Sequence, residues 1–252
     1  MFHGLASGSV AVPGCRLETH LRDVEALNGA ALAGRYDVTK LSFHAWLLVR
    51  DRYRLLDAGA ALGYGCGPLV VSREPMDRGG VSNGRVAVPG ERTTAHLLFR
   101  LWAPDAADRV FARYDRIIPM VSRGDAGAGV IIHEGRFVFR EAGLHAVADL
   151  GQWWEHETGL PIPLGCIAVR ETLGEDTIAG VEKAVRRSIR AAQAHPERTH
   201  DYVLKHAAEM NRDVLERHIA TFVNDFSLGL GETGRRAVSK LEERAAAAGV
   251  TE

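Results

Sequence analysis

One histidine stands out as a candidate catalytic base, because a glycine-bounded apolar run ends at it. The run Ala128–Ile132 (AGVII) leads directly into His133, Glu134 and Gly135. Such short apolar runs are typical of strands covered on both faces, as in the parallel sheets of α/β proteins. Ligands of open α/β folds bind beyond the carboxyl ends of the strands, where His133 would lie. Histidine suits proton transfer near neutral pH, although a histidine that merely caps a strand fits the same spacing.

Two strand-to-helix turns supply candidate binding groups. The strand Tyr36–Ser42 runs straight into a helix over residues 43–50, and the strand Arg85–Gly90 precedes a helix that Thr93 and Thr94 open. The first turn of a helix leaves backbone amides without partners, so both turns can bind an anion or a hydroxyl in the crevice. Ser42 fits equally well as a simple N-cap, and Thr93 and Thr94 suit that position too.

Composition and charge favour a small-molecule partner. The chain has 31 Lys and Arg against 32 Asp and Glu, a formal net charge of -1, which gives no reason to expect nucleic acid or an anionic membrane. Cys15, Cys66 and Cys166 are widely spaced and lack the pairing that structural zinc requires, so we expect no metal and a reducing compartment. No apolar run is long enough to span a membrane and Met1–Gly4 does not resemble a secretion signal. We therefore expect a soluble cytoplasmic protein, of unknown oligomeric state.

The order of elements predicts two α/β units. A helix over residues 23–33, capped by Asp23, precedes the first strand, and residues 74–85 form a polar, Gly- and Pro-containing connection at which the pattern restarts. After it, strand, helix, strand, helix and the His133 strand follow one another with short connections, which predicts a small parallel sheet. From Thr177 onward the chain is helical.

Five segments carry a resemblance to a known family. They are Asp37–Phe43 (DVTKLSF), Val86–Gly90 (VAVPG) with Thr93–Ala95, Gly129–Glu134 (GVIIHE), Gly159–Gly165 (GLPIPLG) and Val223–Leu228 (VNDFSL). In this order they resemble the 1,4-dihydroxy-6-naphthoate synthase family of the futalosine route to menaquinone, from about Phe2 to about Leu241. The resemblance implies an α/β fold of the periplasmic-binding-protein type II, with two domains, each a mostly parallel sheet flanked by helices, and a cleft between them. The expected domains are a larger discontinuous one, 1–80 plus 170–252, and a smaller inserted one, 81–169.

The resemblance also implies an activity and a site. The family's reaction is the lyase conversion of cyclic dehypoxanthinyl futalosine to 1,4-dihydroxy-6-naphthoate and a dihydroxyacetone-type fragment, with no cofactor. The family's proton acceptor falls on His133. Its substrate-binding segments fall on Lys40, Leu41 and Ser42 and on Thr94 and Ala95, to which we add the neighbouring Thr93. Glu134, next along the expected strand, should face away from His133.

Two points keep alternatives open. Family members begin with a strand and a Ser-Pro-Cys-Pro-Asn-Asp type loop before the segment that matches Phe2–Leu5, so we expect the larger domain to lack its first strand here. A chorismate dehydratase, the sister family in the same pathway, and a solute-binding protein of a transporter would share the scaffold, because fold does not fix function.

Overall fold

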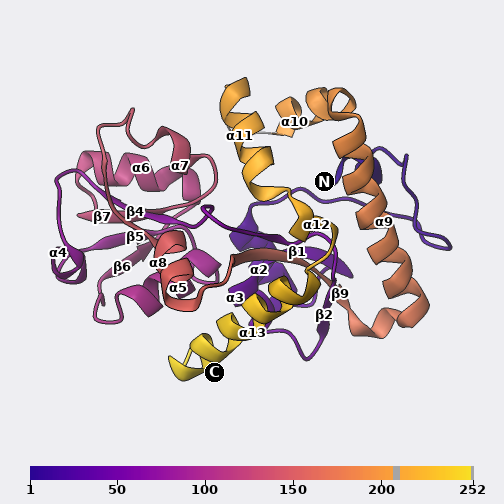
Figure 1. Ribbon diagram of the computed structural model, residues 1–252, viewed down its shortest axis with the longest axis horizontal. Helices are drawn as coiled ribbons and strands as arrows, with labels where there is room; N and C mark the ends of the chain where they lie inside the picture. The colour runs from indigo at the N-terminus through magenta and orange to yellow at the C-terminus, as the bar shows by residue number, and fades with distance from the viewer. Residues whose placement is uncertain (207–210, 251–252) are drawn as a thin grey trace.

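Two lobes, each built on its own sheet, make up the computed structural model, which describes residues 1–206 and 211–250 (Figure 1). In the first sheet one long strand, β9 (Ile162–Arg170), pairs with three others, which are β1 (Val38–Ser42), β2 (Tyr53–Leu55) and β3 (Ala61–Gly63). The second sheet has the order β6-β5-β7-β4-β8. Its strands are β4 (Leu69–Ser72), β5 (Val86–Val88), β6 (Arg109–Phe111), β7 (Ala128–Ile131) and β8 (His145–Asp149).

Helices cover both sheets. In chain order the N-terminal and central ones are α1 (His3–Ala6), α2 (Val24–Leu32), α3 (Phe43–Leu47), α4 (Arg78–Ser82), α5 (Thr94–Trp102), α6 (Tyr114–Arg123), α7 (Gly135–Val138) and α8 (Leu150–Thr158). The C-terminal ones are the 3-10 turns η1 (Glu171–Leu173) and η2 (Pro196–Thr199), with α9 (Glu175–Ala194), α10 (His200–His206), α11 (Arg212–Phe222), α12 (Asp225–Leu228) and α13 (Gly231–Ala247). Figure 1 shows α11 standing near the junction of the two lobes. No helix of the described residues is both long and apolar enough to cross a bilayer.

Local sequence signals set several of these boundaries as predicted. Asp23 caps α2, its side chain accepting a hydrogen bond from the Glu25 amide at 2.9 Å. Thr93 caps α5 in the same way, accepting from the His96 amide. Gly124 ends α6 in the left-handed conformation, at φ 85°, where a residue without a β-carbon avoids strain. α2, α5 and α6 therefore begin or end where the sequence predicts.

The α/β class with two sheets is confirmed, but the expectation of mostly parallel sheets is wrong. All three described pairings of β9 are antiparallel. In the second sheet β5 is parallel to β6 and β7, whereas the pairs of β4 with β7 and β8 are antiparallel. Strand β4 is antiparallel to both β7 and β8 although all four of its residues are buried. A continuous apolar run indicates that a strand is buried on both faces. Helices bury parallel and antiparallel strands alike here, so burial does not reveal strand direction.

The chain crosses between the sheets twice. The first crossing lies between β3 and β4, before the predicted boundary at residue 81, and the return runs through α8 to β9. The two crossings meet at Gly67 and Gly151, where a β-carbon on Gly67 would lie 2.2 Å from the Gly151 nitrogen. The Leu150 amide also donates to the Pro68 carbonyl at 2.9 Å. The backbones therefore touch directly at the junction, and the division 1–80 plus 170–252 against 81–169 stays a prediction.

Candidate active site

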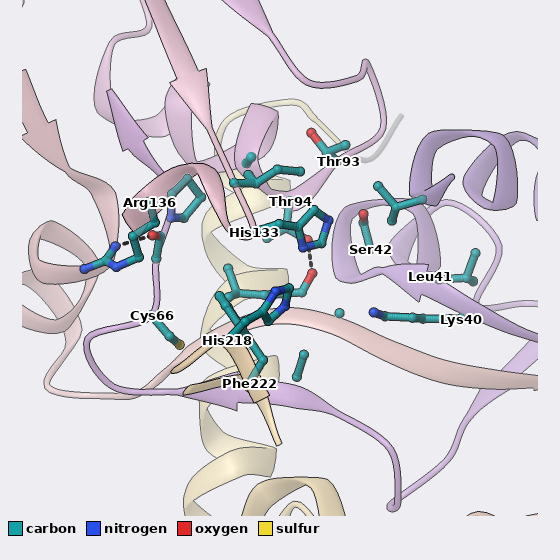
Figure 2. A pocket seen from close by; sticks show the side chains of 18 residues that line it. Lys40, Leu41, Ser42, Cys66, Thr93, Thr94, His133, Arg136, His218 and Phe222 are labelled. Carbon is teal, nitrogen blue, oxygen red and sulfur yellow. Dashed lines mark hydrogen bonds between the residues drawn. The ribbon is translucent and has the colours of Figure 1, made fainter. Parts of the chain in front are cut away.

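One cavity lies where the two sheets meet, and every residue assigned to the site from the sequence lines it. The cavity has about 690 Å³ of empty volume, a figure that includes its open mouth. The predicted residues on its wall are Lys40, Leu41, Ser42, Thr93, Thr94, Ala95 and His133. Residues from later parts of the chain, Arg136, Leu164, His218 and Phe222, line it as well (Figure 2).

Ser42 is held by a buried asparagine. The Asn28 side chain, fully buried on α2, donates from Nδ2 to Ser42 Oγ at 3.2 Å and accepts from the Ser42 amide at 3.0 Å. Ser42 makes no side-chain capping bond to α3, so the simple N-cap explanation does not hold. Asn28 also donates to the Glu25 carboxylate and to the Arg92 carbonyl. The Ser42 hydroxyl is thereby fixed on the cavity wall.

The Thr94 hydroxyl joins three segments of the chain. It donates to the Leu164 carbonyl of β9 at 2.7 Å (Figure 2). It accepts from the His44 amide of α3 at 3.3 Å. Thr93 donates to the Gly90 carbonyl while capping α5. The threonine hydroxyls are therefore engaged within the protein. The amides of Thr94 and Ala95, in the first turn of α5, belong to those that a helix leaves without internal partners.

His133 reaches the cavity from a strained turn rather than from a strand. Strand β7 ends at Ile131, and His133 has φ 54°, the one positive value at a non-glycine residue of the described chain. A left-handed residue with a side chain costs roughly 1–2 kcal/mol, so the surrounding structure must hold it. Tyr114 packs edge-on against the ring at 5.1 Å. We expected Glu134 to face away from His133 because side chains alternate along a strand. Neither residue lies in a strand, so that argument does not apply.

Burial and positive charge keep this imidazole neutral. Burial, and after it the charges of Lys40 and the neighbouring His218, together lower the pKa of His133 to about 3. Lys40 itself has a lowered pKa, chiefly because burial disfavours its ammonium form. A neutral imidazole carries a free lone pair at neutral pH, so His133 is ready to accept a proton.

A second imidazole, which the sequence did not single out, lies beside the first. His218 of α11 stacks on His133 with ring centroids 5.8 Å apart and an interplanar angle of 23°. Phe222, one turn later on α11, packs edge-on against His218 at 4.7 Å. Burial, followed by the charge of Lys40, lowers the pKa of His218 to about 4. The signal in the sequence is weak, because a histidine on an amphipathic helix usually marks a solvated face.

A cation–anion pair closes the end of the cavity opposite Lys40. Arg136, which Figure 2 shows at this end, donates from Nη2 to Asp149 Oδ2 at 2.6 Å and from Nη1 to the Gly67 carbonyl. Both side chains of the pair are mostly buried. Asp149 also caps α8 by accepting from the Gly151 and Gln152 amides. Arg136 thus holds the connection between β3 and β4 in place at Gly67. Among the described residues no three His, Cys, Asp or Glu side chains gather closely enough to hold a metal ion.

Comparison with known proteins points to one pathway. A family model described as menaquinone biosynthesis matches residues 1–247. The chain is 50% identical over 250 residues to a 1,4-dihydroxy-6-naphthoate synthase of Thermus thermophilus, covering 99% of this chain and 90% of the relative. It is 44% identical over 256 residues to a synthase of the same name from Streptomyces coelicolor, covering 99% and 89%.

Solved structures support the fold. A protein from Archaeoglobus fulgidus superimposes with a TM-score of 0.93 at 36% identity, covering 99% of this chain and 92% of the other. The alkanesulfonate-binding protein of Xanthomonas axonopodis pv. citri superimposes with a TM-score of 0.67 at 12% identity, covering 93% and 83%. The second likeness concerns the fold alone: this binding protein shares the two-lobed architecture.

Proposed function

The chain belongs to the menaquinone biosynthesis family, and we propose that it acts there as a 1,4-dihydroxy-6-naphthoate synthase. The reaction is a carbon–carbon lyase reaction that converts cyclic dehypoxanthinyl futalosine to 1,4-dihydroxy-6-naphthoate and a dihydroxyacetone-type fragment. The observation that carries the proposal is that every residue predicted for this activity lines one cavity between the lobes. Two relatives of that name, similar over nearly the whole chain, support it.

The other two functions have weaker support. Neither reported relative is named a chorismate dehydratase. The likeness to the alkanesulfonate-binding protein is 12% identical, which carries the fold and no ligand. An enzyme acting on a small molecule in the cytoplasm, with no nucleic acid as partner, accords best with the balanced charge and with relatives named as biosynthetic enzymes.

In the proposed mechanism His133 is the base. It removes a proton from a hydroxyl of the substrate; the oxygen's electron pair forms a carbonyl, the neighbouring carbon–carbon bond breaks, and the departing carbon takes up a proton. The first-turn amides of Thr94 and Ala95 bind the substrate's carboxylate or hydroxyls from one side of the cavity. The Ser42 hydroxyl binds the substrate from the other side. Lys40 and Leu41 complete this binding wall, and Thr93 positions the turn through its cap.

The direct test is incubation of the purified protein with cyclic dehypoxanthinyl futalosine. Chromatography should detect 1,4-dihydroxy-6-naphthoate and the three-carbon fragment in equal amounts. Chorismate, offered in a parallel incubation, should be recovered unchanged. Conversion of chorismate without conversion of the futalosine derivative would replace the proposed activity with that of the sister enzyme.

We further propose that residues 1–80 plus 170–252 and residues 81–169 act as two domains that close on the substrate. The cavity at their junction would then lose its mouth and exclude water from the reacting bond. Small-angle scattering should show a smaller radius of gyration with 1,4-dihydroxy-6-naphthoate bound. Superimposable curves would indicate a preformed site instead.

A further inference from the structure

We propose that His218 is a second catalytic base of this cavity, acting on the substrate beside His133 at a different atom. The proposal rests on the synthase activity proposed above and deepens it, because it divides the proton transfers of that reaction between two imidazoles. No residue of α11 was assigned to the site from the sequence.

The position of His218 is that of a reacting group. Its ring lies on the cavity wall and belongs to α11, whereas His133 follows β7 of the second sheet. Figure 2 shows the two rings one below the other, with Lys40 at the same end of the cavity. Their centroids are 5.8 Å apart, so a substrate beside them presents neighbouring atoms to different imidazoles. Phe222 fixes the far side of the His218 ring.

A carboxylate orients His218 for proton acceptance. Glu134 Oε2 lies 3.8 Å from His218 Nδ1, and both side chains are largely sheltered, with exposed fractions of 18% and 29%. A carboxylate at this distance favours the proton on Nδ1, which leaves the lone pair on Nε2. The lowered pKa of His218, caused first by burial and then by Lys40, keeps that lone pair free at neutral pH. The distance of 3.8 Å is too long for a hydrogen bond, so Glu134 acts on the His218 ring through its negative charge.

The chemistry of the product requires a second proton removal. A 1,4-dihydroxynaphthalene is the aromatic tautomer of a 1,4-diketone, and breaking the bond to the three-carbon fragment leaves a carbonyl on the ring. To become aromatic, the ring must lose a proton from carbon; the carbon–hydrogen electron pair forms a carbon–carbon double bond, and the carbonyl oxygen takes a proton to become a hydroxyl. His218 accepts the carbon's proton at Nε2 and returns it to that oxygen, so the imidazole ends neutral.

The two steps give the two histidines different signatures. His133 accepts the hydroxyl proton before the bond breaks, and passes it to the departing carbon, so its loss delays both products equally. His218 acts after the bond has broken, so its loss delays the naphthoate alone. A residue that only supports the fold would slow the release of the fragment and of the naphthoate together.

Single-turnover rapid quench with cyclic dehypoxanthinyl futalosine tests this division. In His218→Asn the three-carbon fragment should appear within about threefold of the wild-type rate while the naphthoate forms more slowly by about 100-fold or more, the scale of a lost general base. Glu134→Gln should give a shorter lag of the same kind, because it removes only the orienting charge. His145→Asn, an exposed histidine on β8, is the matched control and should show no lag.

The outcomes separate the inference from the function on which it rests. Equal slowing of both products in His218→Asn, or both at the wild-type rate, overturns the second base while leaving the synthase activity in place. Millimolar imidazole, added to His218→Ala, should shorten the delay in naphthoate formation. A delay that imidazole does not change also counts against proton transfer at this position. A wild-type protein that forms neither product removes the proposed function and this inference with it.

Discussion

Two walls of one cavity are built in different ways. The hydroxyl wall, formed by Ser42, Thr93 and Thr94, is fixed by hydrogen bonds to Asn28, Leu164, His44 and Gly90. The imidazole wall, formed by His133 and His218, is held by ring contacts with Tyr114 and Phe222 and by a positive φ at His133. Hydroxyls held in place suit recognition, whereas neutral rings with free lone pairs suit proton transfer. Substitutions should therefore separate binding from turnover according to the wall they touch.

The largest effect is expected on the imidazole wall. His133→Asn should lower kcat by about 100-fold or more, the usual contribution of a general base. Asparagine tolerates the left-handed conformation, so the melting temperature should stay close to that of the wild type. Steady-state kinetics and calorimetry on the same preparation measure both. A variant with near wild-type turnover would move the base to another group.

Next comes the support of the hydroxyl wall. Asn28→Ala removes the buried amide that binds Ser42, Glu25 and Arg92, and leaves the Ser42 amide without that partner. Loss of such a buried network should cost about 2–3 kcal/mol of unfolding free energy. Urea denaturation measures it, and Asn83→Ala, an exposed asparagine after α4, should change little. A variant of unchanged stability would mean that the wall does not depend on Asn28.

A smaller effect, confined to binding, is expected from Ser42→Ala. Asn28 keeps its bonds to Glu25 and Arg92, so the fold should lose little stability. One hydrogen bond to the ligand is worth about 1 kcal/mol, so the Kd of 1,4-dihydroxy-6-naphthoate should rise about fivefold. Anaerobic fluorescence titration gives the Kd, with Ser239→Ala on the exposed face of α13 as control. A larger loss of stability than of affinity would make Ser42 structural.

A separate effect, on stability alone, is a dependence of the unfolding free energy on pH. His133 and His218 have pKa values lowered by burial to about 3 and about 4, and burial lowers those of His96 and His44 as well. The unfolded chain then binds more protons than the folded one below about pH 6.5, so stability is complete above that pH and falls as the pH drops. The melting temperature should therefore fall between about pH 7 and about pH 5, and less steeply in His133→Asn. Equal slopes would show that folding does not lower the pKa of His133.

The sequence predicted those site residues whose positions follow from the local pattern of a single strand or helix. His133 follows a buried run, Thr93 and Thr94 open a helix, and Lys40–Ser42 end a strand, so each reaches the cavity through its own element. His218 and Asn28 depend on how distant helices pack, and nothing in the neighbouring residues reports that packing. Strand direction escaped prediction for a related reason, because β4 is buried on both faces by helices whatever its direction.

The contact between Gly67 and Gly151 bears on how the substrate range of this fold can change. A side chain at either position would overlap the other's backbone, so the width of the junction is set by main chain against main chain. Point mutations in the lining can therefore alter the polarity of the cavity without widening the gap between the lobes. Evolution of a site for bulkier substrates would require both crossings to change together. Evolution of a different reaction on a substrate of the same size would require only new side chains in the lining.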